Sequence, residues 1–135
     1  MSEVLAGQAS ADMRAQANRA AALAYLQHYA RKDIAAIEAM LAEDVSLRDW
    51  QIAVQGKAAA LAETRKNFAS AGGIAIEVLN LIADANSVAA ELKIRVDLVD
   101  AADPVELFVI DVISFNPQGQ IHSIRAYLGR GEALS

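Results

Sequence analysis

The first half of the chain carries apolar residues at the spacing of amphipathic helices. Between residues 9 and 31 they recur with a period of about 3.6 among good helix formers, which predicts one long helix. Asp33 is a typical N-cap residue, and the apolar positions over residues 34–41 predict a short second helix after it. Residues 57–70 predict a third helix, which we expect to end at the glycine pair 72–73.

The second half of the chain alternates between apolar and polar residues, as half-buried strands do. The clearest strand places one apolar set on a single face: Val88, Ala90, Leu92, Ile94, Val96 and Leu98. Including two short early segments, strands are predicted over residues 45–49, 52–55, 74–82, 88–99, 105–115 and 120–128. Helices followed by an antiparallel meander predict an α+β fold whose single sheet can curve around a pocket.

Composition indicates one domain that acts on or binds a small molecule. The 135 residues contain no repeat or linker, so we expect one domain over residues 1–135, with residues 1–9 as a flexible tail. The absence of cysteine excludes disulfides, thiolate metal sites and a cysteine nucleophile. Twelve Lys and Arg against 17 Asp and Glu give a net charge of -5, without the basic patch of a nucleic-acid binder.

Membrane and export signals are also missing from the pattern. No apolar stretch approaches the roughly 20 residues of a membrane helix. The opening residues are polar and acidic, without the basic region of a signal peptide. We therefore expect a soluble, cytoplasmic protein.

Asp111 is the most informative residue, because two apolar residues flank it on each side in an apolar run. An ionised, unpaired carboxylate in such a setting would cost several kcal/mol. It either pairs with a cation on an adjacent strand, such as Arg95 or Arg125, or reaches water at a sheet edge. Otherwise it stays protonated with a raised pKa and donates a hydrogen bond. Perturbed carboxylates of this last kind often mark functional sites.

Two further residues are candidates for chemistry. Asp49 follows a short strand and precedes Trp50, so it is either a carboxylate base beneath an aromatic lid or an ordinary turn aspartate. Tyr25 lies in the first predicted helix, and the alternative to a functional role is a core tyrosine whose hydroxyl reaches water. His28 and His122 lie far apart without metal-binding spacing, so no metal site is predicted.

Two stretches of the chain resemble bacterial ketosteroid isomerases, members of the nuclear-transport-factor-2-like, or SnoaL-like, superfamily. One runs over residues 25–49 and the other over 109–127, within a likeness that covers roughly residues 10–128. Generic motifs such as Leu41-Ala-Glu-Asp44 and Gly119-Gln-Ile121 imply only the fold. That fold has three N-terminal helices packed on a curved, mostly antiparallel sheet that forms a cone around an apolar pocket.

The combination of Tyr25, Asp49 and Asp111 is the specific part of this resemblance. In these isomerases, which are a known case of a carboxylic acid kept neutral by its surroundings, a tyrosine and a protonated aspartate form an oxyanion hole. The resemblance implies a cofactor-independent isomerase in which Asp49 moves the proton and the other two residues stabilise an enolate. It further implies a steroid-like apolar ketone as substrate and a homodimer through the outer sheet face.

Strand alternation and the resemblance together predict the residues of the pocket wall. We expect the wall to include Trp50, Phe115, Ile124, Ala126 and Leu128. The chain departs from the best-known isomerases at two places where they carry supporting tyrosines, because the aligned residues here are Leu41 and Thr64. The tyrosine network is therefore expected to be missing, and Tyr25 to be less acidic.

Three other interpretations remain open. A SnoaL-like polyketide cyclase also uses an aspartate as acid and base, but does not need Tyr25 and Asp111 as a donor pair. A limonene-epoxide-hydrolase-like enzyme uses an Asp-Arg-Asp constellation, and Ala126 stands where its last aspartate would be. Arg95 and Asp97 alone do not replace it. The third interpretation is a non-catalytic small-molecule-binding domain, because fold does not determine function.

Overall fold

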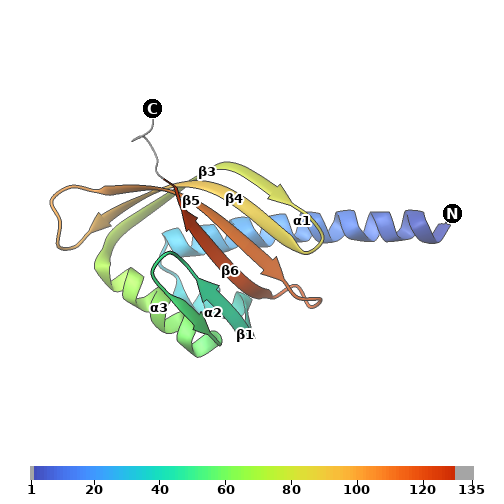
Figure 1. Cartoon of the computed structure of the whole chain (residues 1–135), viewed down its shortest axis with the longest axis horizontal. Coiled ribbons are helices and arrows are strands. Elements are labelled where there is room, and N and C mark those ends of the chain that lie inside the picture. Colours follow the sequence, from blue (N-terminus) through green and yellow to red (C-terminus); the bar gives the residue numbers. More distant parts are fainter. Residues whose placement is uncertain (1, 130–135) are drawn as a thin grey trace.

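The computed structural model describes residues 2–129 and shows three helices packed against a curved six-stranded sheet (Figure 1). The elements run in the order α1 Ser2–Ala30, α2 Ile34–Met40, β1 Leu41–Arg48, β2 Ala53–Gln55, α3 Lys57–Ser70, β3 Ala71–Ala83, β4 Ser87–Leu98, β5 Val105–Phe115 and β6 Ile121–Leu128. This confirms the α+β fold and the curved, mostly antiparallel sheet.

The strands lie in the order β2-β1-β6-β5-β4-β3, and every neighbouring pair is antiparallel except β1 and β6. The β3–β4 and β4–β5 hairpins form the long arm of the sheet, and β5–β6 closes the meander. Register shifts interrupt β3 between Val78 and Asn80 and β5 between Ser114 and Phe115. Such irregularities bend strands and increase their twist, which helps the sheet to curve around its helices.

Helix α1 begins earlier than the sequence predicts, whereas helix α2 begins at the predicted residue. Helix α1 starts at Ser2 rather than at residue 9, so the tail expected over residues 1–9 is helical from Ser2 onward, and Met1 lies outside the described residues. Its N-terminal part extends beyond the sheet (Figure 1). Helix α2 has the predicted N-cap, because the Asp33 carboxylate accepts a hydrogen bond from the Ala36 backbone N–H at 3.1 Å.

Helix α3 has the predicted bounds, but the glycine pair after it does not terminate it. Ala71 is already extended, and Gly72 and Gly73 lie inside β3. Their lack of a side chain serves close packing instead. A Cβ on Gly72 would lie 3.3 Å from the backbone oxygen of Asp97, and one on Gly73 would lie 3.2 Å from an Asp97 carboxylate oxygen. Strand β4 therefore approaches β3 closely at this point.

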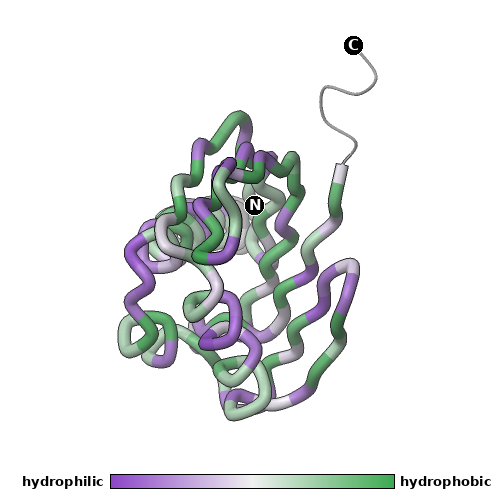
Figure 2. Tube along the Cα trace, turned by 90° about the vertical axis from the view of Figure 1, so that its left-hand side faces the viewer, coloured by the Kyte–Doolittle hydropathy of each residue, from purple (hydrophilic) through white to green (hydrophobic). Residues whose placement is uncertain are grey.

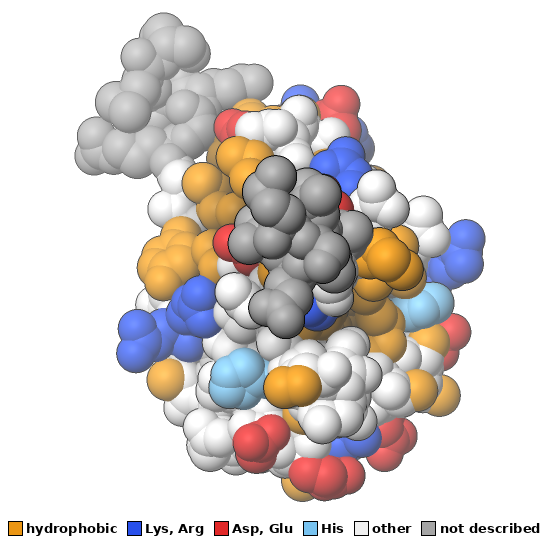
Figure 3. All heavy atoms as spheres, turned by 90° about the vertical axis from the view of Figure 1, so that its right-hand side faces the viewer, with side chains coloured by type: hydrophobic (Ala, Val, Ile, Leu, Met, Phe, Trp, Pro, Cys, Tyr) orange, Lys and Arg blue, Asp and Glu red, His pale blue; other side chains and the backbone are white. Residues whose placement is uncertain are grey.

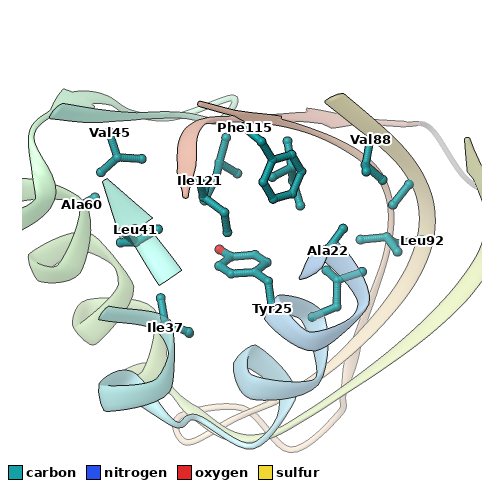
Figure 4. Packing of buried hydrophobic residues seen from close by; sticks show 14 of the residues in the cluster. Ala22, Tyr25, Ile37, Leu41, Val45, Ala60, Val88, Leu92, Phe115 and Ile121 are labelled. Atoms are coloured by element: carbon teal, nitrogen blue, oxygen red, sulfur yellow. The ribbon is translucent and has the colours of Figure 1, made fainter. Parts of the chain in front are cut away.

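The core fills the space between the helices and the concave sheet face, and Figure 4 shows its side chains pointing toward one another from both layers. Val88, Ala90 and Leu92 are fully buried, which confirms the predicted alternation of β4. Hydropathy changes repeatedly along the strands in Figure 2. One face of the sheet therefore packs against the helices and also lines the cavity described below.

The surface carries charges of both signs. On the face seen in Figure 3, Lys and Arg side chains are scattered among acidic and apolar ones rather than gathered in one patch. Within residues 2–129, no helix is both long enough and apolar enough to cross a membrane.

Candidate functional site

A cavity of about 410 Å³ lies between the concave sheet face and the helices α1 and α3. This volume is in the range of sites for small organic molecules. Strands supply most of its apolar wall, including Ile74, Ile76, Ile94, Val96, Leu107 and Val109. The cavity therefore suits a largely hydrophobic ligand.

The structure brings the three predicted chemical residues to this one cavity. Tyr25 from α1, Asp49 from the turn after β1 and Asp111 from β5 all line it. The third acidic side chain in the wall is Glu63 of α3, and no Lys, Arg or His among residues 2–129 lines the cavity. An anionic ligand would find no counter-charge there, so the wall disfavours anions, and its aliphatic sheet side suits an apolar ligand.

Asp111 lies in the middle of β5, opposite Ala90 of β4 and Ala126 of β6. Asp111 is half-buried between these two small neighbours and lines the cavity. The carboxyl forms no ion pair with any residue from 2 to 129. Burial raises the pKa of Asp111 from its ordinary value of 3.8 to about 7.

The cations considered as partners for Asp111 lie elsewhere. Arg95 has an exposed side chain whose Nε lies 4.0 Å from an Asp97 carboxylate oxygen. Arg125 donates to the Ser123 hydroxyl at 2.8 Å, and neither arginine lines the cavity. Of the alternatives stated for Asp111, the structure therefore favours the carboxyl that retains its proton near neutral pH.

Tyr25 is buried among core residues, as Figure 4 shows, with 5% of its surface exposed. Its hydroxyl forms no hydrogen bond with the residues described. Within the same part of the chain no buried side-chain N or O atom lacks a partner, so this hydroxyl is not sealed in the core and opens to the cavity. Burial, followed by the charges of Tyr29 and Asp111, raises the pKa of Tyr25 well above its usual value near 10. It is therefore a neutral donor.

The supporting tyrosines of the best-known isomerases have no equivalent here. Leu41 is buried and apolar, and the Thr64 hydroxyl donates to the backbone oxygen of Ala60 at 2.9 Å within α3. Neither residue assists Tyr25.

Asp49 is held by the turn that connects β1 to β2. Its Oδ1 accepts hydrogen bonds from the backbone N–H groups of Gln51 at 2.7 Å and Ile52 at 2.9 Å. The second oxygen, Oδ2, accepts no hydrogen bond from the residues that the structure describes. The carboxylate is thus both an ordinary turn aspartate and a fixed group with one oxygen available at the cavity.

Three of the five predicted wall residues line the cavity. Trp50, with 44% of its surface exposed, lies at its edge, and Ile124 and Ala126 form part of the sheet wall. Phe115 does not line it, because the register shift after Ser114 pairs it with Ile121 and places it in the closed core. Leu128 does not line it either. It is 46% exposed at the end of the last strand.

Polar wall residues that the sequence did not indicate come from the helices. Tyr29 of α1 and Glu63 and Asn67 of α3 line the cavity. The signal for Tyr29 was its position one turn after Tyr25, on the same face of the helix. Glu63 and Asn67 were hidden because polar residues at helical spacing are the usual pattern of a solvent-facing surface.

Arg95 and Asp97 lie on the exposed outer sheet face, so they supply no Asp-Arg-Asp arrangement to the cavity. Within residues 2–129, no group of three or more His, Cys, Asp or Glu side chains is placed to hold a metal ion.

Comparison with known proteins places this geometry in context. A family model described as a SnoaL-like domain matches residues 22–124. A solved structure of the epoxide hydrolase/cyclase-like enzyme SalBIII, associated with pyran ring formation in the polyether salinomycin, superposes with a TM-score of 0.76 at 24% identity. That match covers 85% of this chain and 92% of the other.

A second solved structure, of an LEH-like epoxide hydrolase from M. tuberculosis, gives a TM-score of 0.71 at 20% identity. It covers 84% of this chain and 82% of the other. No curated protein sequence matches. At these identities the two structural similarities establish the fold, and the function has to be argued from the cavity.

Proposed function

The chain belongs to the SnoaL-like domain family, and from this premise we propose that it is an enzyme that moves a proton between two carbon atoms of a neutral, apolar ketone. The observation that carries the proposal is that Tyr25 and Asp111, whose pKa values are both raised by burial, line an apolar cavity together with Asp49. Donors aimed at a developing oxyanion are among the largest contributions to catalysis.

The proposed reaction is an isomerisation through an enolate. Asp49 Oδ2 removes a proton from the carbon between a carbonyl and an alkene, and the electron pair moves onto the carbonyl oxygen. The O–H groups of Tyr25 and Asp111 hydrogen-bond that oxygen. Asp49 then returns the same proton to the far alkene carbon, and the product is a conjugated enone with the composition of the substrate.

The cavity wall supports a neutral and apolar substrate. Its charged residues are the acids Asp49, Glu63 and Asp111, and its sheet side is aliphatic. A β,γ-unsaturated 3-oxosteroid meets these requirements, because it is flat, uncharged and carries the carbonyl and alkene in the necessary relation. We propose a compound of this kind as the substrate class.

Opening of an epoxide by an internal hydroxyl is the second candidate, because the cavity wall holds two carboxyl groups, of which Asp111 has a raised pKa. In that reaction Asp111 would donate its proton to the epoxide oxygen, and Asp49 would take the proton of the attacking hydroxyl. The same two carboxyl groups therefore serve both reactions. The difference lies in Tyr25, which only the enolate reaction requires as a second donor to one oxygen.

The two reactions are distinguished by turnover. Purified protein is mixed with a β,γ-unsaturated 3-oxosteroid, and the ultraviolet absorbance of the conjugated enone is followed. We expect a rise that falls by about 10²- to 10⁴-fold in Asp49→Asn, because the general base is lost. Asp44→Asn, an exposed residue of β1 outside the cavity wall, is the matched control.

The proposal is wrong if the folded protein gives no enone. Conversion of a hydroxy-epoxide to a cyclic ether in the same preparation would then establish the second candidate. If neither compound reacts but the ketone changes the fluorescence of Trp50, the only tryptophan, the cavity is a binding site without catalysis.

A further inference from the structure

Two of the four polar side chains of α3 that line the cavity already donate their hydroxyl proton inside the helix. The Thr64 hydroxyl donates to the Ala60 backbone oxygen at 2.9 Å, and the Ser70 hydroxyl donates to the Asn67 backbone oxygen at 3.0 Å. A hydroxyl has one proton to donate, so neither of these groups has a donor left for a ligand.

Tyr29 and Asn67 differ from these residues. The Asn67 side-chain amide donates to the Tyr29 hydroxyl oxygen at 3.1 Å, so the tyrosine is the acceptor in this bond. Among residues 2–129, the hydroxyl proton of Tyr29 and the side-chain oxygen of Asn67 form no hydrogen bond. Both residues line the cavity, which therefore has an unused donor and an unused acceptor next to each other.

Packing holds the ring of Tyr29 in place. The Tyr29 ring meets the buried Phe68 ring edge-on, with centroids 4.9 Å apart and an interplanar angle of 70°. Burial raises the pKa of Tyr29, and the charges of Asp111 and Asp49 add to the rise, while the bond from Asn67 opposes it. The hydroxyl thus stays protonated at neutral pH and lies within electrostatic range of both carboxyl groups.

Tyr29 and Tyr25 serve different positions in the cavity. They are one helical turn apart on α1, about 6 Å along the axis, and their ring centroids are separated by 6.1 Å. Their hydroxyls also have different neighbours, because only the hydroxyl of Tyr29 bonds to Asn67 of α3. The two tyrosines are therefore suited to bind two different oxygen atoms of one ligand.

We propose that Tyr29 and Asn67 form a second polar subsite, which binds an oxygen of the substrate other than the one held by Tyr25 and Asp111. The Tyr29 O–H donates to that oxygen, and the side-chain oxygen of Asn67 accepts from it when the group is a hydroxyl. The substrate class is thereby narrowed to apolar molecules with two separate oxygens, the second being a hydroxyl or a carbonyl. The inference rests on the proposed function only for the position of the first oxygen.

Binding of simple phenols tests the subsite without turnover. The dissociation constants of naphthol and of a set of dihydroxynaphthalenes, which differ in the position of the second hydroxyl, are measured by calorimetry. Methylnaphthols with a methyl group at the same positions control for size. Each ligand is titrated into the wild type, Tyr29→Phe, Asn67→Ala and the matched control Tyr127→Phe, whose side chain is exposed on the outer sheet face.

We expect at least one dihydroxynaphthalene to bind the wild type and Tyr127→Phe about three- to tenfold more tightly than naphthol, as one neutral hydrogen bond provides. Tyr29→Phe should lose this gain and still bind naphthol within about twofold of the wild type. The subsite does not exist if no second hydroxyl improves binding, or if the gain survives in Tyr29→Phe.

Failure of the proposed function has a different signature. In that case the protein gives no enone from the steroid, and Tyr25→Phe leaves naphthol binding unchanged. The gain from the second hydroxyl and its loss in Tyr29→Phe would still be observed.

Discussion

The buried carboxyl of Asp111 makes the stability of the protein depend on pH in an unusual direction. Its pKa is about 7 in the folded chain and near 3.8 when exposed. Between these values the folded state binds a proton that the unfolded state has lost, so stability decreases as pH rises through this window. The stabilisation is complete below the unfolded pKa and is lost once the pH exceeds the folded pKa of about 7.

The size of the effect follows from the two pKa values. Their difference corresponds to about 4 kcal/mol over the whole window, at about 1.4 kcal/mol for each pKa unit. Between pH 5 and pH 8, the accessible part of the window, the same two values give about 2.5 kcal/mol. Asp111→Asn keeps the shape of the side chain and removes the titration, so this loss should disappear in the variant.

Urea unfolding followed by circular dichroism measures this difference. The free energy of unfolding of Asp111→Asn, minus that of the wild type, should increase by about 2.5 kcal/mol from pH 5 to pH 8 and remain level above it. Asp84→Asn is the control. Backbone hydrogen bonds from Asn86 and Ser87 lower the pKa of Asp84. The contribution of Asp84 to the free energy of unfolding is therefore constant from pH 5 to pH 8 and is lost only at lower pH. A difference for Asp111→Asn that stays constant from pH 5 to pH 8 would refute the assignment of a protonated, buried carboxyl.

Three further outcomes are expected. Tyr25→Phe should lower kcat of the proposed isomerisation by about 10²- to 10³-fold, as loss of one oxyanion donor does, with Tyr127→Phe unchanged. Ile113→Ala should lower the free energy of unfolding by about 2–5 kcal/mol in urea melts, because Ile113 is fully buried on β5, whereas Val99→Ala at an exposed site should cost little. Ile110 is 45% exposed and lies opposite Tyr127 of β6. If the chain forms a homodimer through the outer sheet face, Ile110→Glu should give monomers in sedimentation velocity. An unchanged sedimentation coefficient would contradict that interface.

The sequence predicted those elements whose period was undisturbed by tertiary packing. The apolar run of β5 and the helix over residues 57–70 have the predicted bounds. Strand β1 begins at Leu41, four residues before the predicted start at residue 45, because residues 41–44 continue the helical pattern and nothing local marks their pairing with the distant β6. Parallel pairing of β1 with β6 depends on contacts far apart in sequence, which periodicity does not record.

The sequence indicates the unusual acidic residue of the site, but it predicts the residues of the cavity wall less well. An aspartate inside an apolar strand is visible in the sequence, and the structure places Asp111 in the cavity wall. Strand alternation and the resemblance together predict Phe115 and Leu128 in the wall. Alternation fails for Phe115 at a register shift and for Leu128 at the open end of the sheet. The Tyr29–Asn67 pair joins two helices, and no local pattern indicates such a contact.

The most direct test of the account is the pH dependence of kcat/KM for the ketone, because this quantity reports the protonation of the free enzyme. With Asp111 as an oxyanion donor, kcat/KM should fall as pH rises through about 7, by tenfold for each further pH unit. In Asp111→Asn, whose amide donates at every pH, this fall should be absent. A wild-type kcat/KM that stays level from pH 6 to pH 9, or an identical fall in Asp111→Asn, would contradict the central claim.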